Sequence, residues 1–242
     1  MSQATRDLIL VLADTKRLLG MRYAEWILGA PALEAGIACA SMAQDEWGHG
    51  RLLYALLKDF GDDVDRLEHG REASEYCNLE LLDEPVGSWP DLVVINALAD
   101  TAVTTLLDAM RESSYAPLRQ RVGKIVDEEQ FHAAHGAAWL KRIASAAPEA
   151  QQMLHASVER ALPVILRWFG PDSDRANELL NNGVVNANGT ELRARFLEQV
   201  GPLLAAADGS GALRDLQPSF DGFDERTRRA HNGGPDAATI GR

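Results

Sequence analysis

The sequence predicts an all-α fold: a ferritin-like four-helix bundle with a long crossover and a C-terminal helical appendage. The main observation is that Glu-x-x-His occurs twice, as Glu46 with His49 and as Glu129 with His132. Residues three apart lie on one face of an α-helix, so each pair points to the same side. Bundles of this class hold two metal ions with such a pair from each of two helices and a carboxylate from each of the other two. The repeated pair therefore predicts a metal centre.

Both pairs lie within an apolar stripe whose members are spaced alternately by three and four residues. This spacing is typical of a helix that buries one face in a bundle. A buried carboxylate and imidazole without partners would cost several kcal/mol each, so a metal or mutual hydrogen bonds must compensate. A structural His beside a solvated Glu would explain one motif, but two motifs on matching stripes disfavour it. The two stripes are Cys39, Met42, Glu46, His49, Leu53 and Leu56, and Val122, Ile125, Glu129, His132, Gly136 and Trp139.

Composition sets the frame for this bundle. The 242 residues are 46% hydrophobic, enough for one large domain with an appendage. A net charge of −12 disfavours binding to nucleic acid or to an anionic membrane, because both attract basic surfaces. Cys39 and Cys77 form no C-x-x-C pattern, and we expect both to be packing residues. We find no apolar run long enough to span a membrane and no secretory signal pattern, and we expect a cytoplasmic protein.

From the positions of Pro and Gly and from the helical spacing of apolar residues, we expect three parts. These are a bundle at 1–146, a helical extension at 147–206 and an irregular tail at 207–242. Pro and Gly interrupt residues 62–90, which form the long crossover of the bundle. Asp100 lies in the apolar stripe of the third bundle helix, where an acidic residue is uncommon without a purpose. We expect helices at about residues 6–28, 32–60, 91–112, 116–146, 148–169, 174–182 and 190–206.

The donor types indicate which metal the centre would take. Carboxylates with two imidazoles and no thiolate suit iron first, with manganese possible. Asp45 and Glu128 directly precede the two motif glutamates. We expect each to accept the free ring N–H of the His on the opposite helix, which would orient that ring. The alternative is that both are ordinary acidic neighbours.

Several stretches resemble one known family, the phenylacetic acid catabolic proteins, which include ferritin-like subunits of bacterial phenylacetyl-CoA epoxidase. The resemblance covers most of residues 16–205 and is carried by residues 43–50, 53–54, 114–117, 124–132, 167–172 and 191–196. It implies that Glu46 and Glu129 are catalytic. It also implies a metal-ligand set of Glu46, His49, Asp100, Glu129 and His132.

The same resemblance implies a function and partners. Two ferrous ions would activate dioxygen and insert one oxygen atom into the ring of an aromatic acyl-CoA, with electrons from a separate reductase. The chain would pair with a homologous ferritin-like subunit in an oligomer, with Tyr23, Trp26 and Trp89 as candidate contacts unless they pack in the core. Two alternatives stay open. One is a structural partner subunit without metal, and the other is a ferritin-like protein of metal storage or peroxide handling.

One position departs from the family pattern. The first-helix carboxylate should lie about thirty residues before Glu46, where this chain has Lys16 followed by Arg17. An ammonium cannot ligate a cation. Asp14 or Glu25 would then supply the ligand, or the site would have five protein ligands and a water, or Lys16 would lie where a metal would. Residues 19–26 are also similar to the non-catalytic partner subunit. We expect metal binding to be retained, because both Glu-x-x-His pairs are intact.

Overall fold

The computed structural model describes residues 2–208, 213, 216–230, 233–235, 237 and 240. Helices dominate this part of the chain, which contains one isolated β-bridge between Asp224 and Arg229 and no β-strand. The predicted all-α, ferritin-like bundle is confirmed. Its four long rods are α1 (Gln3–Glu25), α2 (Leu33–Tyr54), the continuous segment Trp89–Asp108 and α6 (Ala116–Ala144).

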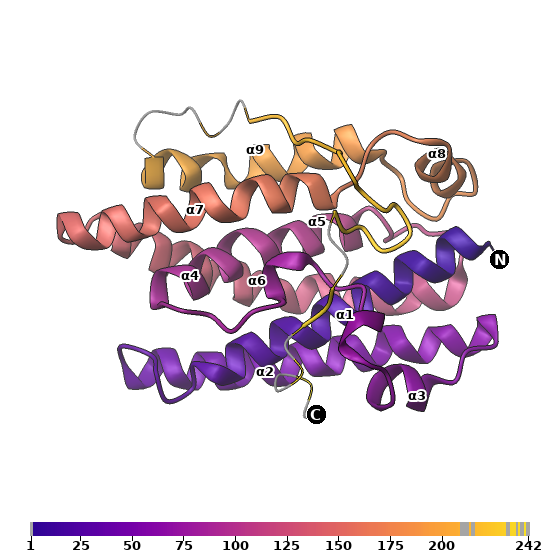
Figure 1. The fold of residues 1–242 in the computed structure, drawn as a ribbon, viewed down its shortest axis with the longest axis horizontal. Helices are drawn as coiled ribbons and strands as arrows, with labels where there is room; N and C mark the ends of the chain where they lie inside the picture. The colour runs from indigo at the N-terminus through magenta and orange to yellow at the C-terminus, as the bar shows by residue number, and fades with distance from the viewer. Residues whose placement is uncertain are drawn as a thin grey trace.

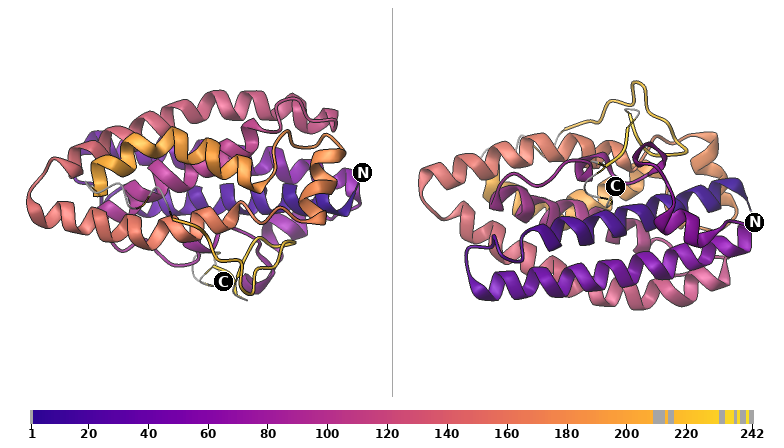
Figure 2. Two further views of the ribbon diagram at one scale, coloured as in Figure 1. Left: turned by 90° about the horizontal axis from the view of Figure 1, so that it is seen from above. Right: turned by 60° about the horizontal axis from the view of Figure 1, so that its bottom comes forward.

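The rods form layers (Figure 1). Helices α1 and α2 pair in one layer and face the Trp89–Asp108 segment and α6. Helices α7 (Pro148–Trp168) and α9 (Gly189–Asp208) cover the opposite side of α4 and α6, as the turned views also show (Figure 2). The C-terminal helices therefore pack directly on the bundle.

Helix α1 is buried on nearly every side. It begins after Ser2, whose hydroxyl accepts the Thr5 N–H, and it ends at Glu25, three residues before the predicted end. Contacts with α2 cover one side, and α8 (Asp174–Asn181) and the crossover cover others. Because of this cover, polar residues in the middle of α1 are inside the protein whichever way they point.

The third rod is one apolar helix with an irregular centre. It consists of α4 (Trp89–Val94), a π-helical turn at Ile95–Asp100 and α5 (Thr101–Asp108). Ser88 accepts the Asp91 N–H at its start, and Pro90 occupies the first turn. This segment is long and apolar enough to cross a membrane by length and composition, but 89% of its most apolar window is buried inside the protein. It is the core helix of the bundle.

The crossover is compact rather than extended. It contains α3 (Val64–His69) and short 3₁₀ turns at Ala55–Phe60, Ala73–Glu75 and Glu80–Leu82. The second rod was predicted to run to residue 60; its last six residues instead tighten into the 3₁₀ turn, which ends at Gly61 in the left-handed conformation.

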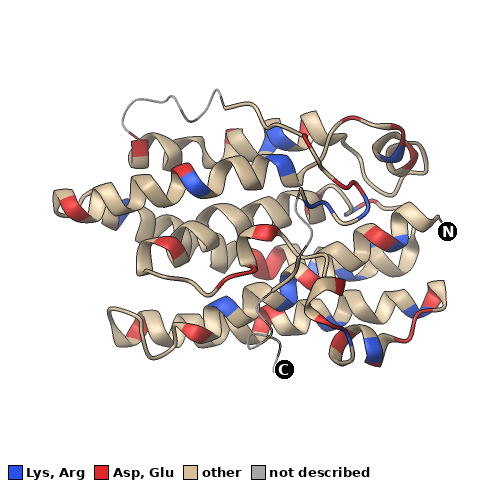
Figure 3. Cartoon of the chain, viewed as in Figure 1, with Lys and Arg blue, Asp and Glu red and all other residues tan. Residues whose placement is uncertain are grey.

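The C-terminal segment 216–230 lies over the crossover and the end of α7 (Figure 2). Arg228 donates to Trp168 O at the end of α7, and Arg229 donates to Asn78 O and pairs with Asp83. Acidic and basic residues are interspersed along the helices (Figure 3). The two cysteines are buried thiols, as expected, and burial raises the pKa of Cys39 to about 11.

Candidate metal centre

Four side chains meet at the centre of the bundle, one from each rod. Lys16 comes from α1, Glu46 from α2, Asp100 from the π-helical turn and Glu129 from α6, and all four are at most 1% exposed. The Lys16 Nζ lies 3.0 Å from Glu46 Oε1, 2.9 Å from Asp100 Oδ1 and 2.7 Å from Glu129 Oε1. The ammonium thus donates to three carboxyl groups at once, at the position where the resemblance led us to expect a first-helix carboxylate.

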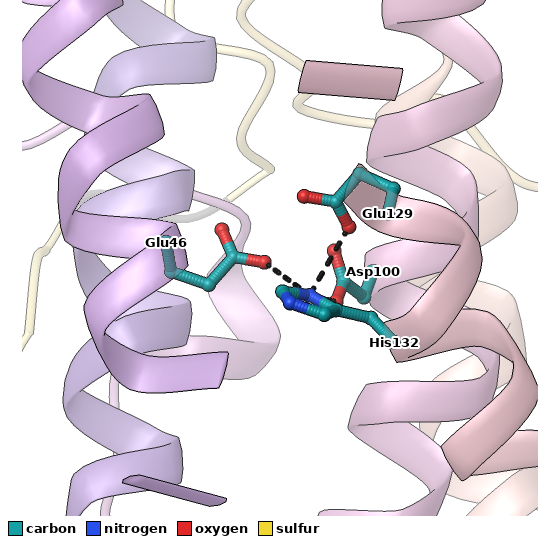
Figure 4. A group of neighbouring side chains, drawn as sticks. All are labelled: Glu46, Asp100, Glu129 and His132. Carbon is teal, nitrogen blue, oxygen red and sulfur yellow. Dashed lines mark hydrogen bonds and ion pairs between the residues drawn. The ribbon is translucent and has the colours of Figure 1, made fainter. Parts of the chain in front are cut away.

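His132 lies among the same three carboxyl groups (Figure 4). Its Nδ1 is 3.2 Å from Glu46 Oε1, 3.2 Å from Asp100 Oδ2 and 3.3 Å from Glu129 Oε2. One N–H cannot donate a good hydrogen bond to three acceptors. One ligand atom from each of the four residues lies within 4.8 Å of the others, which is close enough for a single metal ion to contact all four.

The carboxyl groups are shared between the two sides. Asp100 and Glu129 each turn one oxygen to Lys16 and the other to His132. Glu46 Oε1 faces both the Lys16 ammonium and the His132 ring, whereas its Oε2 is buried and has no hydrogen-bond partner within the described residues. Two of the three carboxyl groups therefore contact the ammonium with one oxygen and the imidazole with the other.

His49 lies on the Lys16 side. Its Nδ1 is 3.0 Å from Glu129 Oε1, a contact that lacks hydrogen-bond geometry. His49 is not part of the compact donor group Glu46, Asp100, Glu129 and His132, whose ligand atoms all lie within 4.8 Å of one another. The structure therefore brings all five predicted ligands to one centre, but groups only four of them around a single point.

The acidic residues before each motif glutamate take the positions that the sequence predicted. Glu128 Oε2 is 2.9 Å from His49 Nε2, and Asp45 Oδ2 is 3.5 Å from His132 Nε2. Each ring is thus bound by a carboxylate from the opposite helix. Such partners fix which ring nitrogen faces inward.

The electrostatics of the centre follow from burial and close charges. Burial, with the charges of Asp100 and Glu129, raises the pKa of Glu46 to about 8. Burial opposes the charge of Lys16, but the three carboxylates raise the pKa of its ammonium well above the ordinary value. Burial also opposes the charged form of His132, whose pKa is raised by its bonds to Asp100 and Glu129. An ammonium and an imidazole thus lie among three carboxyl groups.

The π-helical turn positions Asp100 and a second polar residue, Asn96. A π turn adds one residue to a helical turn and shifts the side chains that follow it, and such turns are frequent at functional sites. Asn96 Nδ2 donates to Tyr23 OH and to His132 O, and Tyr23 OH donates to Asp100 Oδ2 at 2.8 Å. Tyr23 and Asn96 were not predicted here, although Tyr23 lies two helical turns after Lys16 on the same face.

The two residues considered as substitutes for the first-helix ligand lie elsewhere. Asp14 is buried with Arg71, accepts from Tyr54 OH and accepts the Cys77 N–H at 2.8 Å. It therefore joins α1 to the crossover, and the idea that it turns into the metal centre is wrong. Glu25 pairs with Arg22 at the end of α1. The residues of α1 that reach the carboxyl groups of the centre are therefore Lys16 and Tyr23, and neither is a carboxylate.

Comparison with known proteins shows which family the chain belongs to. A family model described as phenylacetic acid catabolic protein matches residues 1–210. The chain belongs to this family. The resemblance noted in the sequence is therefore confirmed.

Two curated relatives come from Escherichia coli strain K12, and both are named as subunits of 1,2-phenylacetyl-CoA epoxidase. The first is 29% identical over 184 residues, which cover 73% of this chain and 58% of the relative. The second, a different component of the same enzyme, is 25% identical over 191 residues, which cover 78% of this chain and 76% of the relative. The chain thus spans less than two thirds of the length of the first relative and is similar to two different epoxidase components.

Proposed function

We propose that this chain is a metal-binding, ferritin-like subunit of a multicomponent oxygenase that acts on an aromatic acyl-CoA. Family membership and the similarity to two epoxidase subunits support the class of complex. The buried donor group supports a metal within it. Iron bound there would supply redox chemistry with dioxygen, using electrons from a separate reductase.

The observation that carries this proposal is the division of the centre between Lys16 and His132. A group of three carboxylates and one imidazole is chemically suited to iron or manganese. The ligands would be Glu46, Asp100, Glu129 and His132, and the unpaired Glu46 Oε2 adds a further oxygen to the set. We therefore propose one metal ion per chain, with the Lys16 ammonium in place of the second.

Lys16 then has a defined electrostatic role. Its single positive charge is held 2.7–3.0 Å from three carboxylate oxygens in a site closed to water. At such distances in a protein interior, one charge offsets several kcal/mol of repulsion among the carboxylates. The ammonium keeps the three groups together whether or not a metal is present, and it leaves His49 without an ion to bind.

A second candidate function rests on the same ammonium. A structural subunit that pairs with a catalytic homologue would need no metal, and the Lys16 contacts already neutralise part of the charge. The contacts of Glu128 with His49 and of Asp45 with His132 favour metal binding. A carboxylate bound to one ring nitrogen orients the other nitrogen toward a metal, and a histidine that binds no metal does not need this orientation.

Oxygen consumption tests the proposed function. The chain is purified together with its co-encoded homologous subunit, loaded with iron under nitrogen and mixed with the reductase. We expect phenylacetyl-CoA to raise oxygen consumption and free phenylacetate to leave it unchanged. Glu129→Gln should abolish the increase, whereas Glu198→Gln on the exposed side of α9 should preserve it. Full activity in Glu129→Gln would show that another component carries the chemistry, and would support the structural role.

A further inference from the structure

A cavity that the proposed metal centre does not use lies where α3 packs against α2, beside α1 (Figure 1). Its volume is about 260 Å³, slightly below the usual range for drug-sized ligands, so it has room for a ligand with one ring. Its lining includes Arg17 and Met21 from α1, Trp47 and Arg51 from α2, and Glu68 and His69 from α3.

Three basic side chains of this lining gather around one carboxylate oxygen. Glu68 Oε1 lies 3.5 Å from Arg17 Nη1, 3.3 Å from Arg51 Nε and 3.8 Å from His69 Nε2. Because both arginines contact the same oxygen, one small anion can bridge their guanidinium groups. With the histidine counted as neutral, the group carries one net positive charge, in a chain whose net charge is −12.

Glu68 does not satisfy the two arginines. Charge-assisted N–H···O⁻ bonds are about 2.7–2.9 Å long, and both arginine contacts with Glu68 are longer. The Arg17 side chain is only 17% exposed, and its one hydrogen bond within the described residues is the contact with Glu68. A guanidinium has five N–H donors, so both arginines keep donors for a second acceptor.

The apolar part of the lining includes an indole ring. Trp47 lies against Gly20 of α1, because a Cβ at position 20 would be 2.5 Å from Trp47 Nε1. Trp47 is nevertheless 36% exposed, and both it and the neighbouring Met21 line the cavity. An aromatic side chain that is partly exposed offers a large apolar surface to a ligand ring.

We infer that this cavity binds an aromatic monocarboxylate. The carboxylate would bridge the guanidinium groups of Arg17 and Arg51, and the ring would pack beside Met21 and Trp47. Arginine binds planar carboxylates through two parallel N–H groups, and one negative charge matches the net charge of the group. A phosphate monoester would bring a second negative charge close to Glu68, which disfavours it. Binding requires neither a metal in the centre nor the proposed oxygenase activity.

A carboxylate in this cavity would connect two helices. Arg17 belongs to α1 and Arg51 to α2, and both already contact Glu68 of α3. A ligand that binds the folded chain and not the unfolded chain raises the melting temperature. We therefore expect the Tm to rise with benzoate concentration and to stay unchanged with the neutral amide, benzamide.

Probes that differ in charge or in ring type test the inference. Titration of the full chain with benzoate and with benzamide is followed by NMR. Benzoate should bind about tenfold or more tightly, because the amide cannot form charge-assisted bonds with arginine. Cyclohexanecarboxylate keeps the charge but has no aromatic ring, and it should bind about two- to tenfold more weakly than benzoate.

The indole N–H signals show where benzoate binds. The chain has five tryptophans, and the signal of Trp47 is assigned by its loss in Trp47→Phe. This signal should move during the benzoate titration and stay in place with benzamide. Movement of another tryptophan signal while that of Trp47 stays in place would put the ligand elsewhere and overturn the inference.

Three charge variants complete the test. Arg51→Gln, at a side chain that is 72% exposed, should lower the affinity for benzoate about tenfold or more. Glu68→Gln should raise the affinity, because it removes the carboxylate that competes for the two arginines. Arg195→Gln, at an exposed position of α9, removes the same charge as Arg51→Gln and should leave the affinity unchanged.

Four further results would overturn the inference. They are equal affinities for benzoate and benzamide, an unchanged benzoate affinity in Arg51→Gln, weaker benzoate binding in Glu68→Gln, and no benzoate binding to the wild type at millimolar concentration.

Discussion

Gly136 of α6 lies directly against Ala97 in the π-helical turn. A Cβ at position 136 would be 2.8 Å from Ala97 N and 2.9 Å from Ala97 Cα, closer than side-chain carbons approach backbone. The absence of a side chain on α6 therefore lets the turn that carries Asn96 and Asp100 approach the helix that carries Glu129. The close approach of these two segments requires glycine at position 136.

Gly136→Ala should destabilise the protein, even though Ala favours a helix. The new methyl group meets backbone that cannot move away alone, and overpacking of this kind costs about 1–3 kcal/mol. Gly123→Ala on the same helix is the control, because its Cβ would meet only the Arg111 guanidinium at 3.9 Å. That variant should gain about 0.5–1 kcal/mol from helix propensity. Urea unfolding measures the free energy of unfolding of both variants. Equal changes in the two variants would contradict the proposed close contact.

Asp14→Asn should lower the free energy of unfolding by more than most single substitutions do. It removes a buried charge from the fully enclosed pair with Arg71 and leaves the guanidinium without its carboxylate. Breaking such a pair costs about 3–5 kcal/mol. Asp127→Asn breaks the exposed pair with Arg111 and should cost less than about 1 kcal/mol. Similar free energies of unfolding for the two variants would show that Asp14 does not hold the crossover.

Asp91 should make part of the stability depend on pH. Burial opposes its charge, but hydrogen bonds from Ser157 and Ser88 and the charge of Arg160 lower the pKa of its carboxyl below the ordinary value. A lowered pKa means that the stabilisation is complete above the unfolded value of about 3.9 and is lost as the pH falls through the folded value.

The comparison of wild type with Asp91→Asn measures this contribution. The variant should be less stable by about 1–2 kcal/mol at pH 7, because it loses charge-assisted hydrogen bonds. The difference should shrink between about pH 4 and pH 2 as the wild-type carboxyl protonates. Glu198→Gln, at an exposed position of α9, should show no such trend. A difference that stays constant to pH 2 would rule out the carboxylate as its source.

The bundle, and the meeting of the two Glu-x-x-His pairs with Asp100 at its centre, could be predicted from the sequence because both leave local patterns. The Glu-x-x-His pairs define a helix face by spacing alone, and Asp100 stands out in an apolar stripe. The bonds of Asp45 and Glu128 to the opposite histidines also followed from position, because antiparallel helices bring these residues together.

Two features of the centre could not be predicted from the sequence. The direction of Lys16 depends on tertiary packing, since its long side chain reaches either the interior or the solvent from the same backbone. Because α1 is buried on nearly every side, the Lys16 side chain cannot reach the solvent. The π-helical turn at residues 95–100 has no local signature, because it adds a residue to a helix without changing its apolar character.

Lys16→Glu decides the central claim that an ammonium replaces one metal. The variant restores a carboxylate at the position where Lys16 Nζ now meets three carboxyl oxygens, and it frees His49 as a ligand. Lys58→Glu changes the net charge by the same amount at an exposed site and serves as the control.

The decisive measurement is the number of tightly bound irons per chain after anaerobic loading and desalting, by elemental analysis and Mössbauer spectroscopy. We expect one iron in the wild type and in Lys58→Glu, and two in Lys16→Glu. No iron in the wild type with two in Lys16→Glu would establish the structural role instead. Two irons in the wild type would contradict the account, because Lys16 could not then occupy a metal position.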